Sequence, residues 1–292
     1  MATQAEGEGM NRVFHHITEE MDLLSQLADG EVGQCPQAGS AEPSRSHALQ
    51  PTSIDETHLD FGREQRKGIP EVILAENKTD TQVLSIAHAF IQTTGRALIS
   101  RMRPELFGRV HEVFAECDLT LREPARAAAI YRRGYAPPQT GGRVGLISAG
   151  TADIPVAEEA RLIAEAMGCV VSPLYDVGVA GLHRLLQPLR LMLEQSVDAI
   201  IVAAGMDGAL PSVVSGLVDV PVIGLPTSVG YGLGGKGVAA LLSMLQTCAP
   251  GLTVVNIDNG VGAGSTAALI ANRVARARQA SSKAMSSRAE EG

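Results

Sequence analysis

The chain has 292 residues, of which 45% are hydrophobic and 19% are charged, and its formal net charge is -8. This composition is typical of globular proteins and is sufficient for one large or two ordinary domains. No run approaches the roughly 18 apolar residues that span a bilayer. Residues 1–9 are small and acidic, unlike a secretory signal, so we expect a cytoplasmic location. The negative charge argues against nucleic-acid and membrane partners, which need basic patches.

The cysteines show no spacing that would suggest a zinc site or a disulfide framework. They are Cys35, Cys117, Cys169 and Cys248. We therefore expect reduced thiols. Aromatic residues make up only 3% of the chain and tryptophan is absent, so base stacking on aromatic side chains is not an expected means of recognition.

Residues 1–54 are predicted to form a helix and a flexible linker. Apolar side chains recur at steps of three and four over 11–28, which favours a helix, whereas 34–54 contains few large apolar residues and favours a linker.

Residues 55–136 are predicted to form a small βαβαβ domain. Strands are expected at 71–75, 97–102 and 127–131, with helices at 81–94 and 104–117. Asp80 is the expected cap of the first helix, and Pro104 opens the second.

Residues 142–278 alternate apolar strands with helices and are predicted to form the main domain. Expected strands are 144–148, 169–175, 199–204, 220–225 and 253–257. Expected helices are 154–167, 181–195, 209–217, 237–248 and 264–277. Strands that are apolar along their whole length suit a parallel sheet covered on both faces. We therefore predict a flavodoxin-like, doubly wound three-layer sandwich, followed by a disordered tail at 279–292.

Turns at the carboxyl ends of these strands carry small or polar residues, and such turns form the ligand crevice in open α/β sheets. The turn 148–153 could bind a phosphate at the start of a helix, or Thr151 or Asp153 could simply cap that helix. The turn 262–266 offers a similar site. Asp207, between two glycines, is either a general base, a metal ligand or a residue stabilised by the helix dipole.

Cys248 is predicted at the carboxyl end of a helix, where the helix dipole opposes formation of a thiolate. A reactive Cys248 needs a nearby cation, either Lys236 or a positively charged substrate ring. Without such a cation, Cys248 is expected to be a small core residue.

Several motifs of the second half resemble the aminoimidazole ribonucleotide carboxylase/mutase family of the purine pathway, and more closely the LarB family of nickel-pincer cofactor biosynthesis. The segments 150–155, 203–211 and 221–226 resemble the purine family. The motifs shared with LarB proteins are the turn 205–212, the loop 226–232, the position of Cys248 and the segment 254–264. The LarB amino-terminal signature is also present, at Arg63, Arg66, 68–73 and Lys78. The purine enzymes have a catalytic histidine directly before the Leu-Pro of the turn, where this chain has Ala209.

The LarB resemblance implies a carboxylase and hydrolase. It would convert nicotinic acid adenine dinucleotide and CO2 to pyridinium-3,5-biscarboxylic acid mononucleotide and AMP. Cys248 would add covalently to the pyridinium ring, and Asp207 would remove the ring proton, although many relatives have glutamate there. The implied substrate-binding residues are Arg63, Arg66, Lys78, Gly150, Thr151, Gly205, Met206, Thr227, Ser228, Tyr231, Gly262 and Gly264.

The resemblance also implies Mg²⁺, held by Asp153 and Asp258, no organic cofactor, and a homo-octamer. Two alternatives stay open. The chain could be a carboxylase or mutase of another ribonucleotide, although Ala209 counts against the purine activity itself. It could instead be a non-catalytic nucleotide-binding protein, against which Cys248 and Asp207 count.

Overall fold

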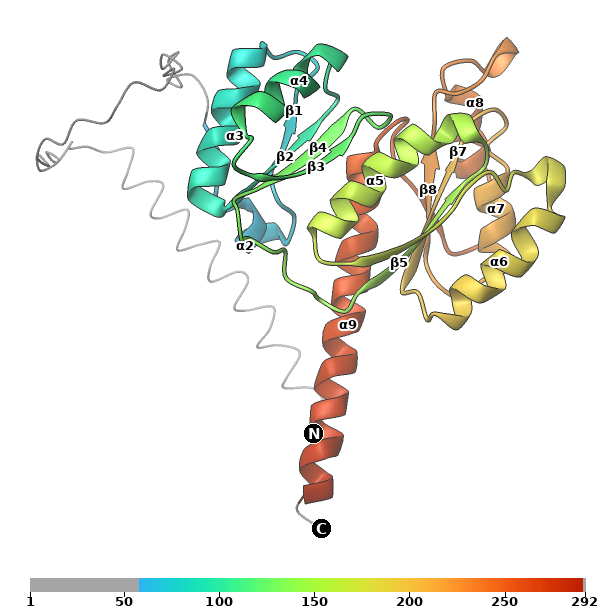
Figure 1. Cartoon of the computed structure of the whole chain (residues 1–292). Helices are drawn as coiled ribbons and strands as arrows, with labels where there is room; N and C mark the ends of the chain where they lie inside the picture. The colour runs from blue at the N-terminus through green and yellow to red at the C-terminus, as the bar shows by residue number, and fades with distance from the viewer. Residues whose placement is uncertain (1–57, 291–292) are drawn as a thin grey trace, which may run out of the picture. The chain divides into compact units, whose positions relative to one another are not determined.

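The computed structural model describes residues 58–290, with side chains described as far as residue 282. This range contains a four-stranded and a five-stranded sheet with their helices (Figure 1). The predicted helix 11–28 and the predicted linker 34–54 lie outside the described residues. Within the described range, no helix combines the length and the apolar character needed to cross a membrane.

The first sheet has the strand order β1-β2-β4-β3. Its elements are α2 (Arg63–Lys67), β1 (Val72–Leu74), α3 (Asp80–Thr94), β2 (Arg96–Ser100), α4 (Pro104–Val113), β3 (Asp118–Arg122) and β4 (Ala127–Tyr131). β1 and β2 are parallel, whereas β4 pairs antiparallel with both β2 and β3. The βαβαβ unit is present, and β3 is an additional strand. The sequence pattern does not predict β3, because Leu119 and Leu121 are its only apolar residues.

The two faces of this first sheet pack against different layers, because side chains alternate along a strand. In β4, Ala128 and Ile130 join the core beneath α3 and α4. Ala127 and Ala129 point the other way and join the core around α5, so the first sheet also covers a helix of the second.

The cap of α3 is Thr79 and not, as predicted, Asp80. The hydroxyl of Thr79 accepts a hydrogen bond from the backbone N–H of Gln82 at 3.2 Å, and the Gln82 side chain accepts one from the N–H of Thr79 at 2.9 Å. Asp80 is the first helical residue and pairs with Arg103 and Arg109, whose hydrogen bonds lower the pKa of its carboxyl group.

The second sheet is entirely parallel, with the order β6-β5-β7-β8-β9. Its strands are β5 (Arg143–Ser148), β6 (Val170–Leu174), β7 (Ala199–Ala204), β8 (Val222–Pro226) and β9 (Leu252–Val254). Its helices are α5 (Ile154–Ala166), α6 (His183–Glu194), α7 (Leu210–Ser215), α8 (Val238–Leu245) and α9 (Gly260–Glu290). α5 and α9 cover one face, and α6, α7 and α8 cover the other (Figure 1). The predicted flavodoxin-like three-layer sandwich is confirmed.

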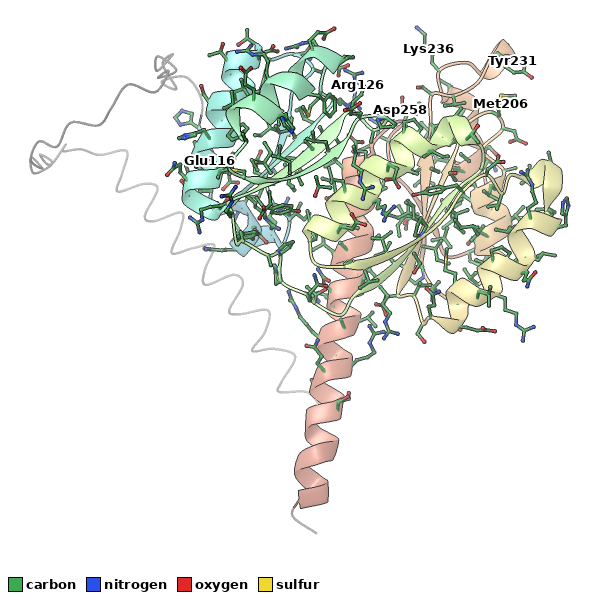
Figure 2. All side chains as sticks on the ribbon, in the orientation of Figure 1. Glu116, Arg126, Met206, Tyr231, Lys236 and Asp258 are labelled. Atoms are coloured by element: carbon green, nitrogen blue, oxygen red, sulfur yellow. The ribbon has the colours of Figure 1, made fainter. Side chains whose placement is uncertain are left out.

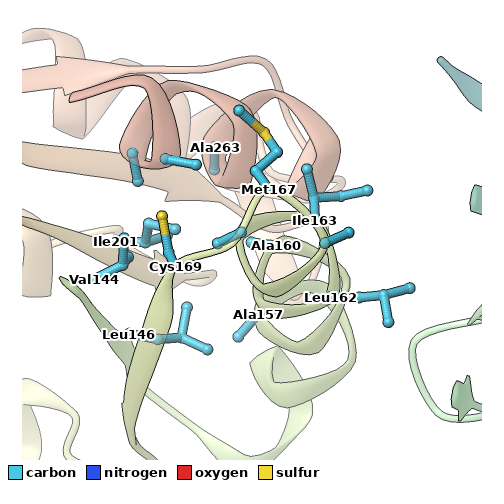
Figure 3. Packing of buried hydrophobic residues seen from close by; sticks show 14 of the residues in the cluster. Val144, Leu146, Ala157, Ala160, Leu162, Ile163, Met167, Cys169, Ile201 and Ala263 are labelled. Atoms are coloured by element: carbon cyan, nitrogen blue, oxygen red, sulfur yellow. The ribbon is translucent and has the colours of Figure 1, made fainter. Parts of the chain in front are cut away.

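α9 begins earlier and ends later than predicted. Asn259 caps its start by accepting a hydrogen bond from the N–H of Gly262 at 2.8 Å. The helix then runs to Glu290, into the stretch predicted to be a disordered tail, because no glycine or proline interrupts it after Gly264. Its first turns pack on α5, where Ala160 and Ile163 face Ala263 (Figure 3).

Candidate functional site

The carboxyl ends of β5, β7, β8 and β9 bring their turns together at one edge of the second sheet. β5 has β6 on one side and β7 on the other. The chain thus moves from β5 first to one side and then to the opposite side, so the strand order reverses at β5. Such a switch point is where open α/β sheets bind ligands. The sequence-predicted residues Asp153, Asp207, Thr227 and Asp258 all follow strands at this edge.

A buried hydrogen bond links the β5 and β8 turns. The hydroxyl of Thr227, which is fully buried, donates to Oδ1 of Asp153 at 2.6 Å. Oδ2 of Asp153 accepts from the N–H of Gly150 at 2.8 Å. Gly205 allows the approach, because a Cβ there would lie 2.7 Å from Oγ1 of Thr227. The Asp153 carboxylate therefore fixes the turns, and its side chain makes no capping hydrogen bond to α5.

Asp207 is exposed in the turn after β7, with Met206 beside it. Oδ1 of Asp207 lies 3.4 Å from the N–H of Ala209, a weak contact that leaves the carboxylate open to solvent. Met206 has a φ of 50° and is 47% exposed. A left-handed backbone is uncommon for a non-glycine residue, and such strain often marks ligand-binding turns. The Met206 N–H donates to the carbonyl of Val229 at 2.8 Å, which connects this turn to residues 227–237 between β8 and α8, called the β8 loop.

Asp258 organises the start of the β8 loop. Its Oδ1 accepts a hydrogen bond from the N–H of Ser228 at 2.8 Å, and its own N–H donates to the carbonyl of Pro226 at 2.9 Å. Asp258 has a φ of 53°, so it too is held in the left-handed region.

The two predicted metal ligands differ in how well they suit a cation. Both oxygens of Asp153 already accept hydrogen bonds and the residue is buried. Oδ2 of the partly exposed Asp258 accepts none from the residues that the structure describes. In the part of the chain that the structure describes, no three His, Cys, Asp or Glu side chains are grouped as metal ligands. Only Asp258 therefore fits a cation that takes its remaining ligands from substrate and water.

The loop 230–237 extends from the same edge and carries Tyr231, 83% exposed, and Lys236, which has a φ of 58°. Figure 2 shows both residues, with Met206, at this end of the molecule. Among the predicted glycines, Gly262 lies in the first turn of α9, and Gly264 lies inside α9, buried against α5. Thr151 is exposed in the short helix Thr151–Asp153 that leads into α5.

Cys248 lies at the opposite edge of the sheet. It follows α8 and precedes β9, whose Leu252 pairs with Val222 at the start of β8. From Val222, β8 extends about 13 Å to its other end at 3.3 Å per residue, and Thr227 follows that end. Cys248 is exposed, and within one chain it lies at the edge of the sheet opposite to the turn that carries Asp207.

The predicted basic residues also separate. Arg63 pairs with Glu71 at 2.8 Å and Arg66 with Asp60 at 2.6 Å, both on the α2 side of the first sheet. Gly68 in that segment packs against Leu269, about 14 Å along α9 from its start. Lys78 instead lines a cleft with Arg101 and Asp258.

This cleft lies between the two sheets and includes residues that sequence reasoning missed. It consists of two adjoining pockets of about 350 and 270 Å³ that share Glu76, Arg101, Glu159 and Asp258. Arg126 lines the second pocket with Ser228 and Val229 of the β8 loop. Arg101 directly follows β2, so applying the strand-end rule to the first sheet as well would have found it.

Comparison with known proteins identifies both parts of the described chain. Residues 143–291 match the AIR carboxylase family, and residues 52–132 match the LarB/PurE-like N-terminal domain. An uncharacterized protein of Methanocaldococcus jannaschii is 42% identical over 216 residues, covering 73% of this chain and 83% of that protein.

Two similar proteins have names that state an activity. The N5-carboxyaminoimidazole ribonucleotide mutase of Thermotoga maritima is 30% identical, over 44% of this chain and 74% of its own length. The mutase of the same name from Pyrococcus horikoshii is 32% identical, over 45% of this chain and 71% of its own. With a family match that spans half its length and relatives of this similarity, the chain belongs to the AIR carboxylase family, and it carries a LarB/PurE-like N-terminal domain.

Proposed function

We propose that this protein carboxylates the pyridinium ring of nicotinic acid adenine dinucleotide and cleaves its phosphoanhydride. The products would be pyridinium-3,5-biscarboxylic acid mononucleotide and AMP, the first step of nickel-pincer cofactor synthesis. The observation that carries the proposal is the LarB/PurE-like N-terminal domain at 52–132, a region additional to the AIR carboxylase match. The residue Ala209 supports it, because the purine enzymes have their catalytic histidine at this position.

The ring chemistry needs a nucleophile and a base. A pyridinium is too electron-poor to attack CO2, so the Cys248 thiolate first adds to the ring and breaks its aromaticity. The resulting enamine carbon forms the new bond to CO2. Asp207 then takes the ring proton from that carbon, and departure of the thiolate restores the pyridinium. Exposure of Asp207 at the switch point is compatible with this role.

Since Cys248 and Asp207 lie at opposite edges of one sheet, we propose that a second copy of the chain supplies Cys248 to the site. An apolar stripe on α8 supports this arrangement: Val238, Leu242 and Leu245 are all more than half exposed, on the helix that precedes Cys248. A second copy packed on this stripe would bring Cys248 into contact with its neighbour. A homo-octamer would contain such contacts and stays part of the proposal.

Mg²⁺ also stays a proposal. Asp258 would hold it together with the diphosphate of the substrate, since Mg²⁺ commonly binds one or two carboxylates plus phosphates. When bound there, it would neutralise charge on the phosphoanhydride during hydrolysis. The turn at Gly150 and Thr151, at the start of the α5 segment, is the proposed contact for a phosphate.

The test is to incubate the full chain with nicotinic acid adenine dinucleotide, Mg²⁺ and isotopically labelled bicarbonate. We expect mass spectrometry to detect a labelled dicarboxylated mononucleotide and AMP. Cys248→Ala should abolish both label incorporation and product, whereas Cys117→Ala, on a half-buried thiol of the first sheet, should retain them. Label incorporation by Cys248→Ala would exclude the covalent step.

The mutase relatives favour one second candidate, a carboxylase or mutase of another ribonucleotide. Incubation with N5-carboxyaminoimidazole ribonucleotide distinguishes the two candidates. Because a mutase moves the carboxyl group within the molecule and takes up no label, the substrate and its isomer are separated by chromatography. Turnover of that substrate without reaction of the dinucleotide would overturn our proposal.

A further inference from the structure

The cleft between the two sheets contains a cation without a carboxylate partner. Nε of Arg126 donates to the carbonyl of Met102 at 2.7 Å, and Nη2 donates to the carbonyl of Arg101 at 3.3 Å. Of the ion pairs found between residues 58 and 282, whose side chains are described, none includes Arg126, and its side chain is exposed. Backbone carbonyls orient the guanidinium without neutralising it, so its charge remains available to a ligand.

The backbone around this cation is held in an unfavourable conformation. Arg126 has a φ of 52° and Arg101 a φ of 56°, both in the region that glycine and asparagine adopt most readily. The N–H of Met102 donates to the carbonyl of Arg126 at 2.7 Å, which locks the two segments together. Strain of this kind persists where the surrounding structure fixes it, and it often accompanies ligand sites.

The acidic groups around the same cleft are already engaged. Glu76 pairs with Arg101 at 3.2 Å and Glu159 accepts the hydroxyl of Ser100, whereas Asp258 accepts the N–H of Ser228 through Oδ1 and keeps Oδ2 for the proposed cation. Burial raises the pKa of Glu159, which reduces the tendency of that carboxyl group to carry a charge. Arg126 therefore lines a pocket of about 270 Å³ together with Ser228 and Val229 of the β8 loop, as an oriented positive charge.

We propose that Arg126 is an oxyanion-binding residue, which takes a carboxylate or phosphate group of the substrate while the turns of the second sheet hold the rest. The inference rests on the proposed function for the identity of the dinucleotide. It assigns to the LarB/PurE-like N-terminal domain a direct part in substrate recognition. A guanidinium suits this role because its planar donors match the oxygens of carboxylate and phosphate.

Two dinucleotides distinguish the source of the oxyanion. Nicotinic acid adenine dinucleotide has a ring carboxylate, whereas nicotinamide adenine dinucleotide has an uncharged amide on the same diphosphate framework. Their affinities for the full wild-type chain, Arg126→Asn and Arg190→Gln would be measured by calorimetry. Asparagine tolerates the left-handed backbone. Arg190 is a matched control because it is 82% exposed on α6, where it pairs with Glu194.

We expect Arg126→Asn to weaken binding by about tenfold or more, the usual effect of losing a charged hydrogen bond. If only the affinity for nicotinic acid adenine dinucleotide falls, Arg126 binds the ring carboxylate. If the affinities for both dinucleotides fall equally, Arg126 binds the diphosphate. If Arg126→Asn binds both dinucleotides as tightly as the wild type does, the inference is overturned and the proposed function stays intact. Should Arg126→Asn melt early, Arg126→Gly takes its place in this comparison. A wild-type chain that binds neither dinucleotide overturns both.

Discussion

The hydroxyl of Ser100 donates a hydrogen bond to Oε1 of Glu159 and thereby joins β2 of the first sheet to α5 of the second. Oε2 of Glu159 lies at the start of α9, where the N–H groups of Gly260 and Val261 contact the carboxylate. One carboxyl group thus connects three elements around the cleft. It is only 6% exposed, and burial raises its pKa despite these bonds.

Glu159 should therefore make stability fall as pH rises. A carboxyl group whose pKa is raised in the folded state binds more protons when folded than when unfolded. The loss of stability therefore begins as the pH rises above the unfolded pKa of about 4.5, and it is complete above the folded pKa. Glu159→Gln should flatten this dependence, because the amide can donate to Ser100 and accept from the two N–H groups. Thermal melts of both proteins between about pH 4 and 8 test this. Parallel pH profiles would contradict it.

Gly264→Ala should destabilise the contact between α5 and α9. A Cβ at this position would lie 2.3 Å from the carbonyl oxygen of Ala160 and 3.0 Å from Cβ of Ile163, so the helices must move apart. We expect the free energy of unfolding to fall by about 1 to 3 kcal/mol, the range for overpacking.

Urea denaturation measures the change, and Gly108→Ala in α4 is the control. A Cβ at Gly108 would meet no atom within 4 Å, so that substitution should be neutral or raise the free energy of unfolding by about 0.4 to 1 kcal/mol. Equal effects at the two positions would show that helix approach is not the cause.

Much of the second sheet could be predicted from sequence because its signals are local. β7 was predicted with its observed bounds, since its six residues are all apolar and buried. β3 was missed because its burial is partial and its partner β4 follows only after a turn. Periodicity alone does not show such pairing.

The site could be predicted only in part, for a different reason. Spacing along the chain shows which residues follow strands, and this placed Asp207, Thr227 and Asp258 at one edge. Cys248 precedes a strand, and a parallel sheet puts such a residue at the other edge. Arg126 takes its orientation from carbonyls of the segment after β2, a tertiary relationship with no local sequence signal.

Thr227→Val should loosen the turns of the site. The substitution keeps the volume but leaves Oδ1 of the buried Asp153 without its donor. An unsatisfied buried acceptor costs about 1 to 3 kcal/mol of folding free energy. Denaturant titration should show this loss for Thr227→Val and little loss for Thr227→Ser, which retains a hydroxyl. Equal stability of the valine and serine variants would remove Thr227 from the role we assign to it.

Mixing two inactive variants should restore activity if each site combines Asp207 of one copy with Cys248 of another. Asp207→Asn and Cys248→Ala each remove one half of the site, and both residues are exposed, so neither change should prevent folding. In a randomly assembled oligomer of equal parts, about a quarter of the sites would receive both intact residues. Product formation from coexpressed variants, measured with labelled bicarbonate, should therefore reach about a quarter of the wild-type value by this symmetry argument.

A chain carrying both substitutions is the matched control for that mixture. Coexpressed with wild-type chains, it contributes neither Asp207 nor Cys248. A site is then intact only when both of its copies are wild type, which random assembly gives for about a quarter of the sites. Expressed alone, it should yield no labelled product, like each single variant. If the single variants stay inactive when coexpressed, although they assemble together, Asp207 and Cys248 do not act in one shared site. The geometry of the sheet would then require a different base or a different nucleophile.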